Sequence, residues 1–290
     1  RAGARDVVPL PLDMVDLEAA LAPIAESLAK RDPAGETGPA KVVCVIKSLG
    51  GVGATSILSQ LGIRFARQEA RHGREACLID LDVQFGDAAF QLGLQPKLSL
   101  AELIDAGLRL DGDLLRAAST VHSSGLHVIA APPAMLPLES ISSEQLLDII
   151  DQAAREFGTV LVDLPTNWTN WSLSLLARSD LVLLVTQLSV PSLNRARRQL
   201  ELLRSQDLYG IEVRIVVNRL EKSFLRTIRL SDVRDGLGRD VSYTIANEHA
   251  VIRAAIDRGV PIDEIKRKSA IGRDLDILDA GIAAALGLER

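Results

Sequence analysis

The sequence predicts an α/β fold of the doubly wound type, with a mostly parallel seven-stranded sheet and helices on both faces. From about residue 41 onward, short apolar runs rich in β-branched residues alternate with amphipathic helical patterns, and this order of elements builds a parallel sheet. Most of these runs are continuously apolar, as in strands that are covered on both faces. A glycine-rich segment follows the first run directly, where a phosphate-binding turn lies in many α/β proteins.

Each element of this fold has its own signal in the sequence. The apolar runs place strands at residues 42–46, 76–80, 127–131, 159–163, 181–185, 213–217 and 241–245. The helical spacing of apolar residues places helices near residues 54–71, 99–105, 142–156, 192–206, 248–258 and 274–287. The last of these carries several acidic residues and therefore lacks the basic polar face of a membrane-binding helix. We interpret it as a helix that docks on the domain.

The first 39 residues differ from the rest of the chain. Residues 14–30 place apolar side chains at helical spacing, with Pro23 as a break, and residues 31–39 have the composition of a linker. The chain begins at Arg1 rather than at a methionine. We therefore expect residues 1–39 to form a helix and a linker, and we expect that a segment before Arg1 has been removed.

Composition narrows the classes of protein. Of the 290 residues, 47% are hydrophobic, which is enough for a large core and argues against wholesale disorder. The net charge of −5 gives no general attraction to nucleic acid or to anionic membranes. The two cysteines, Cys44 and Cys77, lie in apolar runs and are expected to be reduced core residues of a cytoplasmic protein. No apolar stretch reaches the length of a transmembrane helix, and no signal peptide is recognisable.

The glycine-rich segment, residues 48–56, reads SLGGVGATS. Glycines allow backbone N–H groups to approach a phosphate chain closely, and the N-terminus of the following helix adds its dipole. The alternative is a tight turn from strand to helix with no ligand. On the first interpretation, the nucleotide phosphates bind against Gly50, Gly51, Val52, Gly53, Ala54, Thr55 and Ser56.

Acidic side chains end two of the predicted strands. Asp80 and Asp82 are two residues apart and therefore project to the same side of an extended strand, where such a pair can hold Mg²⁺ and orient an attacking water. Asp163 closes an apolar run, which is the form of a Walker B carboxylate near the metal. The sequence thus predicts Asp80 and Asp82 as the catalytic pair and Thr55, Asp80 and Asp163 as metal ligands. The alternative for Asp80 and Asp82 is a helix cap or an exposed loop. The alternative for Asp163 is an ordinary strand end, since any buried strand can close on an aspartate.

A polar pair follows the strand at residues 213–217. The side chain of Asn218 offers both a donor and an acceptor, which can recognise the edge of an adenine base, and Arg219 comes directly after it. The alternative is a simple turn. We predict that these two residues line the base site.

Together these segments resemble the deviant-Walker P-loop ATPases of the ParA/MinD group, and within it the CpaE/TadZ branch associated with Flp (tad) pilus assembly. The resemblance covers about residues 41–288. It implies a cytoplasmic homodimeric switch that binds ATP and Mg²⁺ and serves as a localisation or assembly factor for pilus secretion proteins, recruited to the cell pole or to the inner-membrane pilus complex. It also implies a receiver-like domain upstream of residues 1–39. The segments that carry the resemblance are SLGGVGATS, LIDLDVQFGDAAFQLGL, SGLHVIAAP, TVLVDLPTNWTNW, DLVLLVTQLSVPSLNRARR and IVVNR.

Three positions depart from the pattern of the wider group. Leu49 stands where the signature lysine reaches across a dimer, and Ala54 stands where the ordinary P-loop lysine precedes Thr55. The group usually has Ile-Pro where this chain has Ile245 and Ala246. A cation that stabilises the transition state of phosphoryl transfer is worth about 10³–10⁵ in rate, so we expect ATP to bind and turnover to be slow or absent. Lys47 is close in sequence and could replace the missing charge, but a residue at a strand end can equally point away.

Two rival functions and one open feature remain at this stage. A partitioning ATPase would need a surface for nonspecific DNA, and a scaffold would bind no nucleotide at all. Trp168 and Trp171, three residues apart, either form a partner surface or pack locally. DNA binding is less favoured than a solvated helix face, and its candidates are Arg195, Arg197, Arg198, Arg204, Arg219, Lys222, Arg226 and Arg229.

Overall fold

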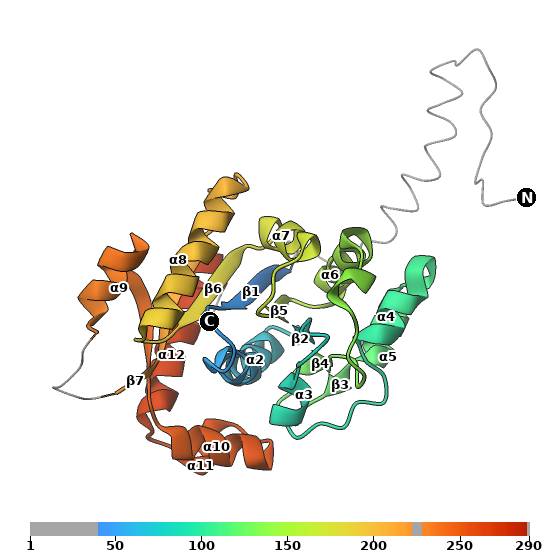
Figure 1. The fold of residues 1–290 in the computed structure, drawn as a ribbon. Coiled ribbons are helices and arrows are strands. Elements are labelled where there is room, and N and C mark those ends of the chain that lie inside the picture. The colour runs from blue at the N-terminus through green and yellow to red at the C-terminus, as the bar shows by residue number, and fades with distance from the viewer. Residues whose placement is uncertain (1–39, 222–227, 289–290) are drawn as a thin grey trace, which may run out of the picture. The chain divides into compact units, whose positions relative to one another are not determined.

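The computed structural model describes residues 40–221 and 228–288 (Figure 1). The helix and linker predicted for residues 1–39 lie outside the described residues, so that prediction stays open. The described part is built around one eight-stranded sheet with the order β3-β4-β2-β5-β1-β6-β7-β8. Its strands are β1 (Lys41–Lys47), β2 (Ala76–Asp80), β3 (Thr120–Val121), β4 (His127–Ile129), β5 (Thr159–Asp163), β6 (Leu181–Thr186), β7 (Val213–Leu220) and β8 (Val241–Ala246).

The predicted mostly parallel α/β sheet is confirmed, with one strand more than expected. All seven predicted strands are present and pair in parallel. The additional strand is β3, which pairs antiparallel with β4 at the edge of the sheet. It has two residues, and so short a run carries no periodicity that a sequence could reveal.

Helices cover both faces of the sheet (Figure 1). The six predicted helices are present, and the short helices α3, α5, α7, α9 and α11 were not predicted. Two 3₁₀ turns, Gly107–Arg109 and Leu138–Ser140, complete the helical elements of the described residues. The helices are α2 (Ala54–Arg71), α3 (Ala88–Gln91), α4 (Leu100–Ala106), α5 (Gly112–Ala118), α6 (Ser143–Glu156), α7 (Asn170–Ala177), α8 (Val190–Ser205), α9 (Leu230–Leu237), α10 (His249–Arg258), α11 (Ile262–Ile265) and α12 (Ala270–Leu286).

The sheet divides the core into two layers, and its strands contribute side chains to both. In β1, Val43 and Val45 pack with residues of α2 and α12, whereas Cys44 and Ile46 pack with residues of α6, α7 and α8. This alternation follows from the period of two along a strand. It explains why the strand sequences are apolar throughout, and it confirms the doubly wound arrangement.

The topology directs attention to the carboxyl end of β1. This strand lies between β5 and β6, and the chain crosses from one side of it to the other between those two strands. A crevice at such a crossing, outside the carboxyl ends of parallel strands, is where ligands bind in open α/β sheets. Within the described residues, no helix is both long enough and apolar enough to span a membrane.

Candidate functional site

The glycine-rich segment forms a loop between β1 and α2 at this crevice. Gly51 and Gly53 have left-handed backbone angles, with φ of 76° and 85°, a conformation that side chains rarely adopt. Gly53 is the N-cap of α2 and provides no side-chain cap. The first N–H groups of a helix have no partner within the helix, so this loop and the start of α2 present backbone donors at the carboxyl edge of the sheet.

The loop is held from the opposite side of the crevice by Asn218 at the end of β7. Its Nδ2 donates to the carbonyl oxygen of Val52 at 2.8 Å. A Cβ atom on Gly53 would lie 2.6 Å from this Nδ2, so only glycine allows the approach. Gln187 Nε2 donates to the same carbonyl at 3.4 Å. The loop shape is thus fixed before any ligand arrives.

The side chain of Lys47 points into the site rather than away from it. Its Nζ lies 3.2 Å from Asp82 Oδ2 and 3.3 Å from Asp163, and 3.5 Å from Thr55 Oγ1. The side chain is only 9% exposed. The alternation of β1 contains the signal for this orientation, because Lys47 falls on the same face as Val43 and Val45, the face that α2 covers.

The Lys47 ammonium lies between two side chains that the sequence predicted as metal ligands, Thr55 and Asp163. Thr55 Oγ1 donates directly to Asp163 Oδ2 at 2.5 Å, whereas neighbouring ligands of Mg²⁺, each at 2.0–2.1 Å, are about 2.9 Å apart. Among the residues that the structure describes, no group of three or more His, Cys, Asp or Glu side chains could hold a metal ion. As arranged, these oxygens fit an ammonium group and do not fit Mg²⁺.

The two acids predicted as the catalytic pair organise the loop that follows β2. Asp80 accepts the backbone N–H of Asp82 at 3.1 Å and that of Ala88 at 3.0 Å, one on each carboxylate oxygen. Asp82 Oδ1 accepts the N–H of Phe85 at 3.2 Å. A Cβ atom on Gly86 would lie 2.6 Å from both oxygens of Asp80. Both predicted catalytic carboxylates therefore already hold local partners.

Burial and shared charge dominate the electrostatics. Burial alone would lower the pKa of Lys47, but the carboxylates of Asp163, Asp82 and Asp80 outweigh it and raise that pKa. Burial and the neighbouring Asp163 raise the pKa of Asp80 to about 8. Burial also raises the pKa of Asp163, against the opposing effect of Lys47. One ammonium thus faces three acidic side chains, and the ammonium is charged throughout the physiological range.

A second depression adjoins the start of α2, at the residues that the sequence predicted to line the base site. Asn218 is buried, and its Oδ1 accepts the N–H of Arg219 at 2.8 Å. Arg219 has a φ of 55°, a strained angle that persists only where the surroundings impose it. The depression combines apolar walls with polar groups, as small-ligand sites do. It is lined by Gly53, Ser56, Ile57, Asn218, Arg219, Ala246, Asn247, Glu248, His249, Ile252, Ile271 and Leu275.

The structure brings most of the predicted site residues together and adds one segment. The loop residues, Thr55, Asp163, Asn218 and Arg219 all meet at the crevice. The end of β8 and the start of α10 form a wall of this depression. The family resemblance implied a loop over the base near residue 245, but none of its residues was among the predicted site residues. Asn247 is placed there by its N–H, which donates to the carbonyl of Leu220 at 3.0 Å.

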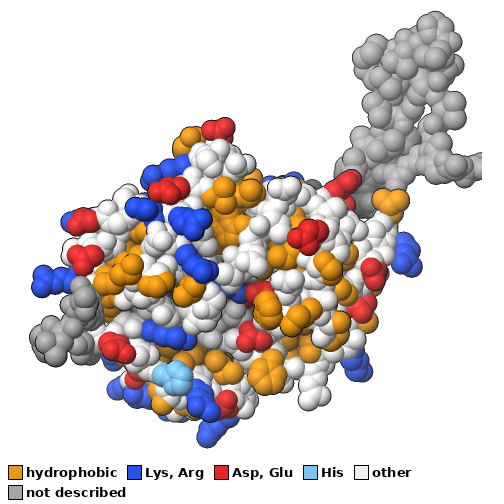
Figure 2. Space-filling model, viewed as in Figure 1, with side chains coloured by type: hydrophobic (Ala, Val, Ile, Leu, Met, Phe, Trp, Pro, Cys, Tyr) orange, Lys and Arg blue, Asp and Glu red, His pale blue; other side chains and the backbone are white. Residues whose placement is uncertain are grey.

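The two tryptophans have different environments. Trp171 is 3% exposed and its Nε1 donates to the carbonyl of Leu138 at 3.0 Å, so it packs in the core. Trp168 lines a groove beside the glycine loop, with Ser48 at one end. The groove also contains Arg195 and Arg198 of α8, where basic side chains gather on the surface (Figure 2).

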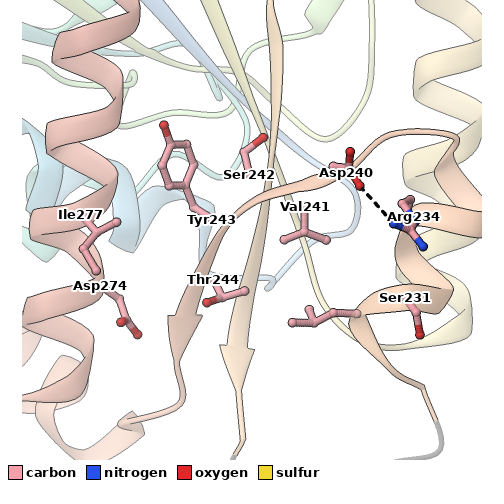
Figure 3. Close-up of a pocket in the computed structure, with 10 residues that line it drawn as sticks. Ser231, Arg234, Asp240, Val241, Ser242, Tyr243, Thr244, Asp274 and Ile277 are labelled. Carbon is pink, nitrogen blue, oxygen red and sulfur yellow. Dashed lines mark ion pairs between the residues drawn. The ribbon is translucent and has the colours of Figure 1, made fainter.

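A further cavity lies apart from the crevice, along the open edge of β8 (Figure 3). It is lined by Val241, Tyr243 and Ile277, and Arg234 pairs with Asp240 at 3.9 Å across its rim. None of the predicted site residues lines this cavity. It is a feature of the sheet edge rather than of the candidate site.

Comparison with known proteins agrees with this geometry. No protein-family model matches the sequence. The septum site-determining protein MinD of Thermotoga maritima is 23% identical over 242 residues, which are 82% of this chain and 86% of that protein. The chloroplastic MinD homologue of Arabidopsis thaliana is 25% identical over 243 residues, 80% of this chain and 71% of that protein.

Solved structures show the same relationship. The ParA family ATPase of Chlorobium tepidum superposes with a TM-score of 0.75 at 23% identity, covering 83% of this chain and 98% of that one. MinD of Pyrococcus horikoshii, complexed with Mg-ADP, gives 0.69 at 17% identity, with 84% and 96% covered. MinD in the MinC:MinD complex of Aquifex aeolicus gives 0.68 at 20% identity, also with 84% and 96% covered. This chain has the fold of the ParA/MinD P-loop ATPases, the group to which these relatives and solved structures belong.

Proposed function

We propose that this chain binds ATP and works as a nucleotide-dependent homodimeric switch that localises or assembles other proteins. The observation that carries the proposal is the glycine loop: two left-handed glycines and the first turn of α2 present backbone donors at the carboxyl ends of parallel strands. The adjoining depression around Asn218 accommodates a base. MinD of Pyrococcus horikoshii holds Mg-ADP on the same fold.

ATP needs a positive charge beside its phosphates. The ammonium of Lys47 and the predicted Mg²⁺ ion compete for the same oxygens, those of Thr55 and Asp163. Hydrolysis is proposed to be slow or absent, because Ala54 replaces the P-loop lysine and the carboxylates of Asp80 and Asp82 hold backbone N–H groups. The steady-state release of phosphate by the purified chain tests this, and turnover of many per second would contradict it.

Titration calorimetry with ATP tests the nucleotide site. The chain is expected to bind ATP, and Gly53→Ala is expected to weaken binding because its Cβ would meet Asn218. The matched control is Gly73→Ala, a left-handed glycine with open space around it. If the wild-type chain binds no ATP at millimolar concentration, the nucleotide proposal fails and the rival scaffold function takes its place.

The groove beside the loop is the proposed homodimer face. It joins Ser48 of the loop to Trp168 and to the exposed arginines of α8, so a second copy seated there would sense the bound nucleotide. Aromatic and arginine side chains are the types that dominate interface energies. Light scattering should show a dimer with ATP, and Trp168→Ala should shift the equilibrium toward the monomer. A mass that ignores both ATP and this substitution would contradict the proposal.

The cellular role that we propose is in a Flp (tad) type pilus secretion system, as a cytoplasmic factor recruited to the pole or to the inner-membrane pilus complex. This step is supported by the CpaE/TadZ resemblance of the DLDVQFGD segment combined with the lysine-free loop. Deletion of the gene should abolish Flp pili while chromosome partitioning and division continue normally. Normal piliation in the deletion strain would overturn it.

The arginines of α8 favour one second candidate, a partitioning-type ATPase that binds nonspecific DNA. Arg195, Arg198 and Arg204 are exposed on one helix, whereas Lys222 and Arg226 lie outside the described residues. Arg197 is partly neutralised by Glu201 at 3.5 Å. Binding of random duplex that falls steeply with salt would support this rival. Binding that stays undetectable at low salt would exclude it.

A further inference from the structure

Among the residues that the structure describes, Lys47 is the only lysine or arginine that forms ion pairs with Asp82 and Asp163, the acids beside the glycine loop. It comes from the last position of β1, so its backbone is fixed in the central strand of the sheet. Gln199 Nε2 donates to its carbonyl oxygen at 2.9 Å. The ammonium is therefore presented from a rigid element, on the strand side of the loop.

The oxygens around this ammonium are those that hold the metal in P-loop proteins. There the loop Ser or Thr hydroxyl and the Walker B carboxylate bind Mg²⁺, and here the corresponding side chains are Thr55 and Asp163. The ammonium contacts both, at 3.5 Å and 3.3 Å. Asp82 completes its surroundings at 3.2 Å. The side chains that correspond to the metal ligands of P-loop proteins therefore contact the Lys47 ammonium here.

One of the three donors of the ammonium has only a long contact and is available to a phosphate. It has three N–H donors, two of which are taken by Asp82 and Asp163 at 3.2 Å and 3.3 Å. The third reaches Thr55 Oγ1 at 3.5 Å, the longest of the three contacts. Thr55 lies in the first turn of α2, beside the backbone donors of the loop. A phosphate oxygen arriving at the loop is a stronger, charged acceptor for that third donor than a hydroxyl group.

We propose that Lys47 is the resident cation of this site, so that it replaces both the P-loop lysine and the divalent metal and ATP binds without Mg²⁺. This inference rests on the proposed ATP-binding function. The chain has no cation at Leu49 or Ala54, and on this proposal Lys47, at the end of the strand, supplies the positive charge instead. It also assigns to Lys47 a ligand-binding role that its buried ion pairs alone do not require.

Calorimetry with ATP on the wild-type chain, in excess MgCl₂ and again in EDTA, tests the inference directly. The Kd for ATP is expected to differ by less than about threefold between the two conditions, a difference below about 1 kcal/mol. A loss of about a hundredfold or more in EDTA would overturn the inference while leaving the ATP-binding function in place. Absence of binding in both conditions would overturn the function and the inference together.

Lys47→Met adds the converse test. In EDTA this variant should bind ATP at least about tenfold more weakly than wild type, and Mg²⁺ should restore part of the affinity because the emptied oxygens can now take a metal. Lys41→Met is the matched control, since Lys41 lies on the same strand and pairs with Asp180 at 3.3 Å on the surface. Unchanged binding of Lys47→Met in EDTA would overturn the inference.

A second variant serves if Lys47→Met does not fold. Asp163→Asn keeps the Lys47 ammonium and should still bind ATP in EDTA. Loss of that binding would count against Lys47.

Discussion

Strand β1 carries a lysine at each end, and the two are in opposite environments. Lys41, at the amino end, pairs with Asp180 while 35% of its side chain remains exposed. Lys47, at the carboxyl end, is 9% exposed and pairs with two buried carboxylates. Exposed pairs contribute about 0–1 kcal/mol, whereas a buried pair carries a desolvation cost that its attraction only partly offsets. The comparison teaches that the surface pair of Lys41 contributes little to stability, whereas Lys47 compensates two carboxylates that would otherwise be buried without a cation.

Substitution of the two lysines should show the largest difference. Lys47→Met leaves Asp82 and Asp163 buried without their cation, so the free energy of unfolding should fall by about 3–5 kcal/mol. Lys41→Met should cost at most about 1 kcal/mol. Urea unfolding of the two variants measures both changes. Equal losses would show that the two ends of the strand do not differ in the way described.

The next largest difference in stability is expected between substitutions of Gly53, at the carboxyl end of the sheet, and Gly73, at its amino end. Gly53→Ala combines a left-handed angle with a contact at 2.6 Å to Asn218 and should cost about 2–4 kcal/mol. Gly73, between α2 and β2, is left-handed, but a Cβ atom added to it would meet no other atom within 4 Å, so its substitution should cost about 1 kcal/mol. Thermal unfolding of the pair checks this. A costlier Gly73→Ala would contradict the assignment of the tight approach to the carboxyl end.

Asn218→Ala should have a smaller effect on stability. It removes the donor to the carbonyl of Val52 and should lower the free energy of unfolding by about 1–2 kcal/mol. Because the loop loses its support, ATP affinity should fall by about tenfold. Asn170→Ala, at an exposed position of α7 outside the depression, is the control for a purely local change. ATP binding that tolerates Asn218→Ala would separate this residue from the site.

The smallest effect is expected at the amino end, where Arg116 joins Glu75 and Glu156. The hydrogen bond from Arg116 holds the pKa of Glu75 below its usual value of 4.5. A lowered pKa in the folded state stabilises above the unfolded value and loses that contribution as pH falls through the folded one. Arg116→Gln should therefore cost less than about 1 kcal/mol at pH 7, since the pair is largely exposed. Unfolding measured from pH 7 down to pH 3 should show the difference shrinking, and a difference that grows would contradict it.

The fold could be predicted from the sequence because its signals are long and local. Most of the seven predicted strands are apolar runs, and α2 and α6 have three or more turns of periodic apolar residues. The missed elements are short: α3 and α11 have four residues each. One turn of helix carries no periodicity to detect, and contacts from elsewhere in the chain decide its conformation.

The site was predictable in its parts but not in its assembly. The glycine loop, Asp163 and Asn218 each follow a strand, and parallel strands bring their carboxyl ends together. The sequence could not show that Asp80 would satisfy backbone donors of its own loop, because that depends on how residues 80–88 close. The direction of the Lys47 side chain could not be decided for a similar reason, although the alternation along β1 already favoured the face that α2 covers.

A crystal structure grown with ATP in excess Mg²⁺ is the most direct test of the central claim, that backbone donors and Lys47 together hold a triphosphate. The account predicts phosphate density against Gly51 and Gly53, with Lys47 Nζ in contact with it and no metal between Thr55 and Asp163. A loop without nucleotide, or a Mg²⁺ ion bound there with the Lys47 side chain turned away, would contradict it.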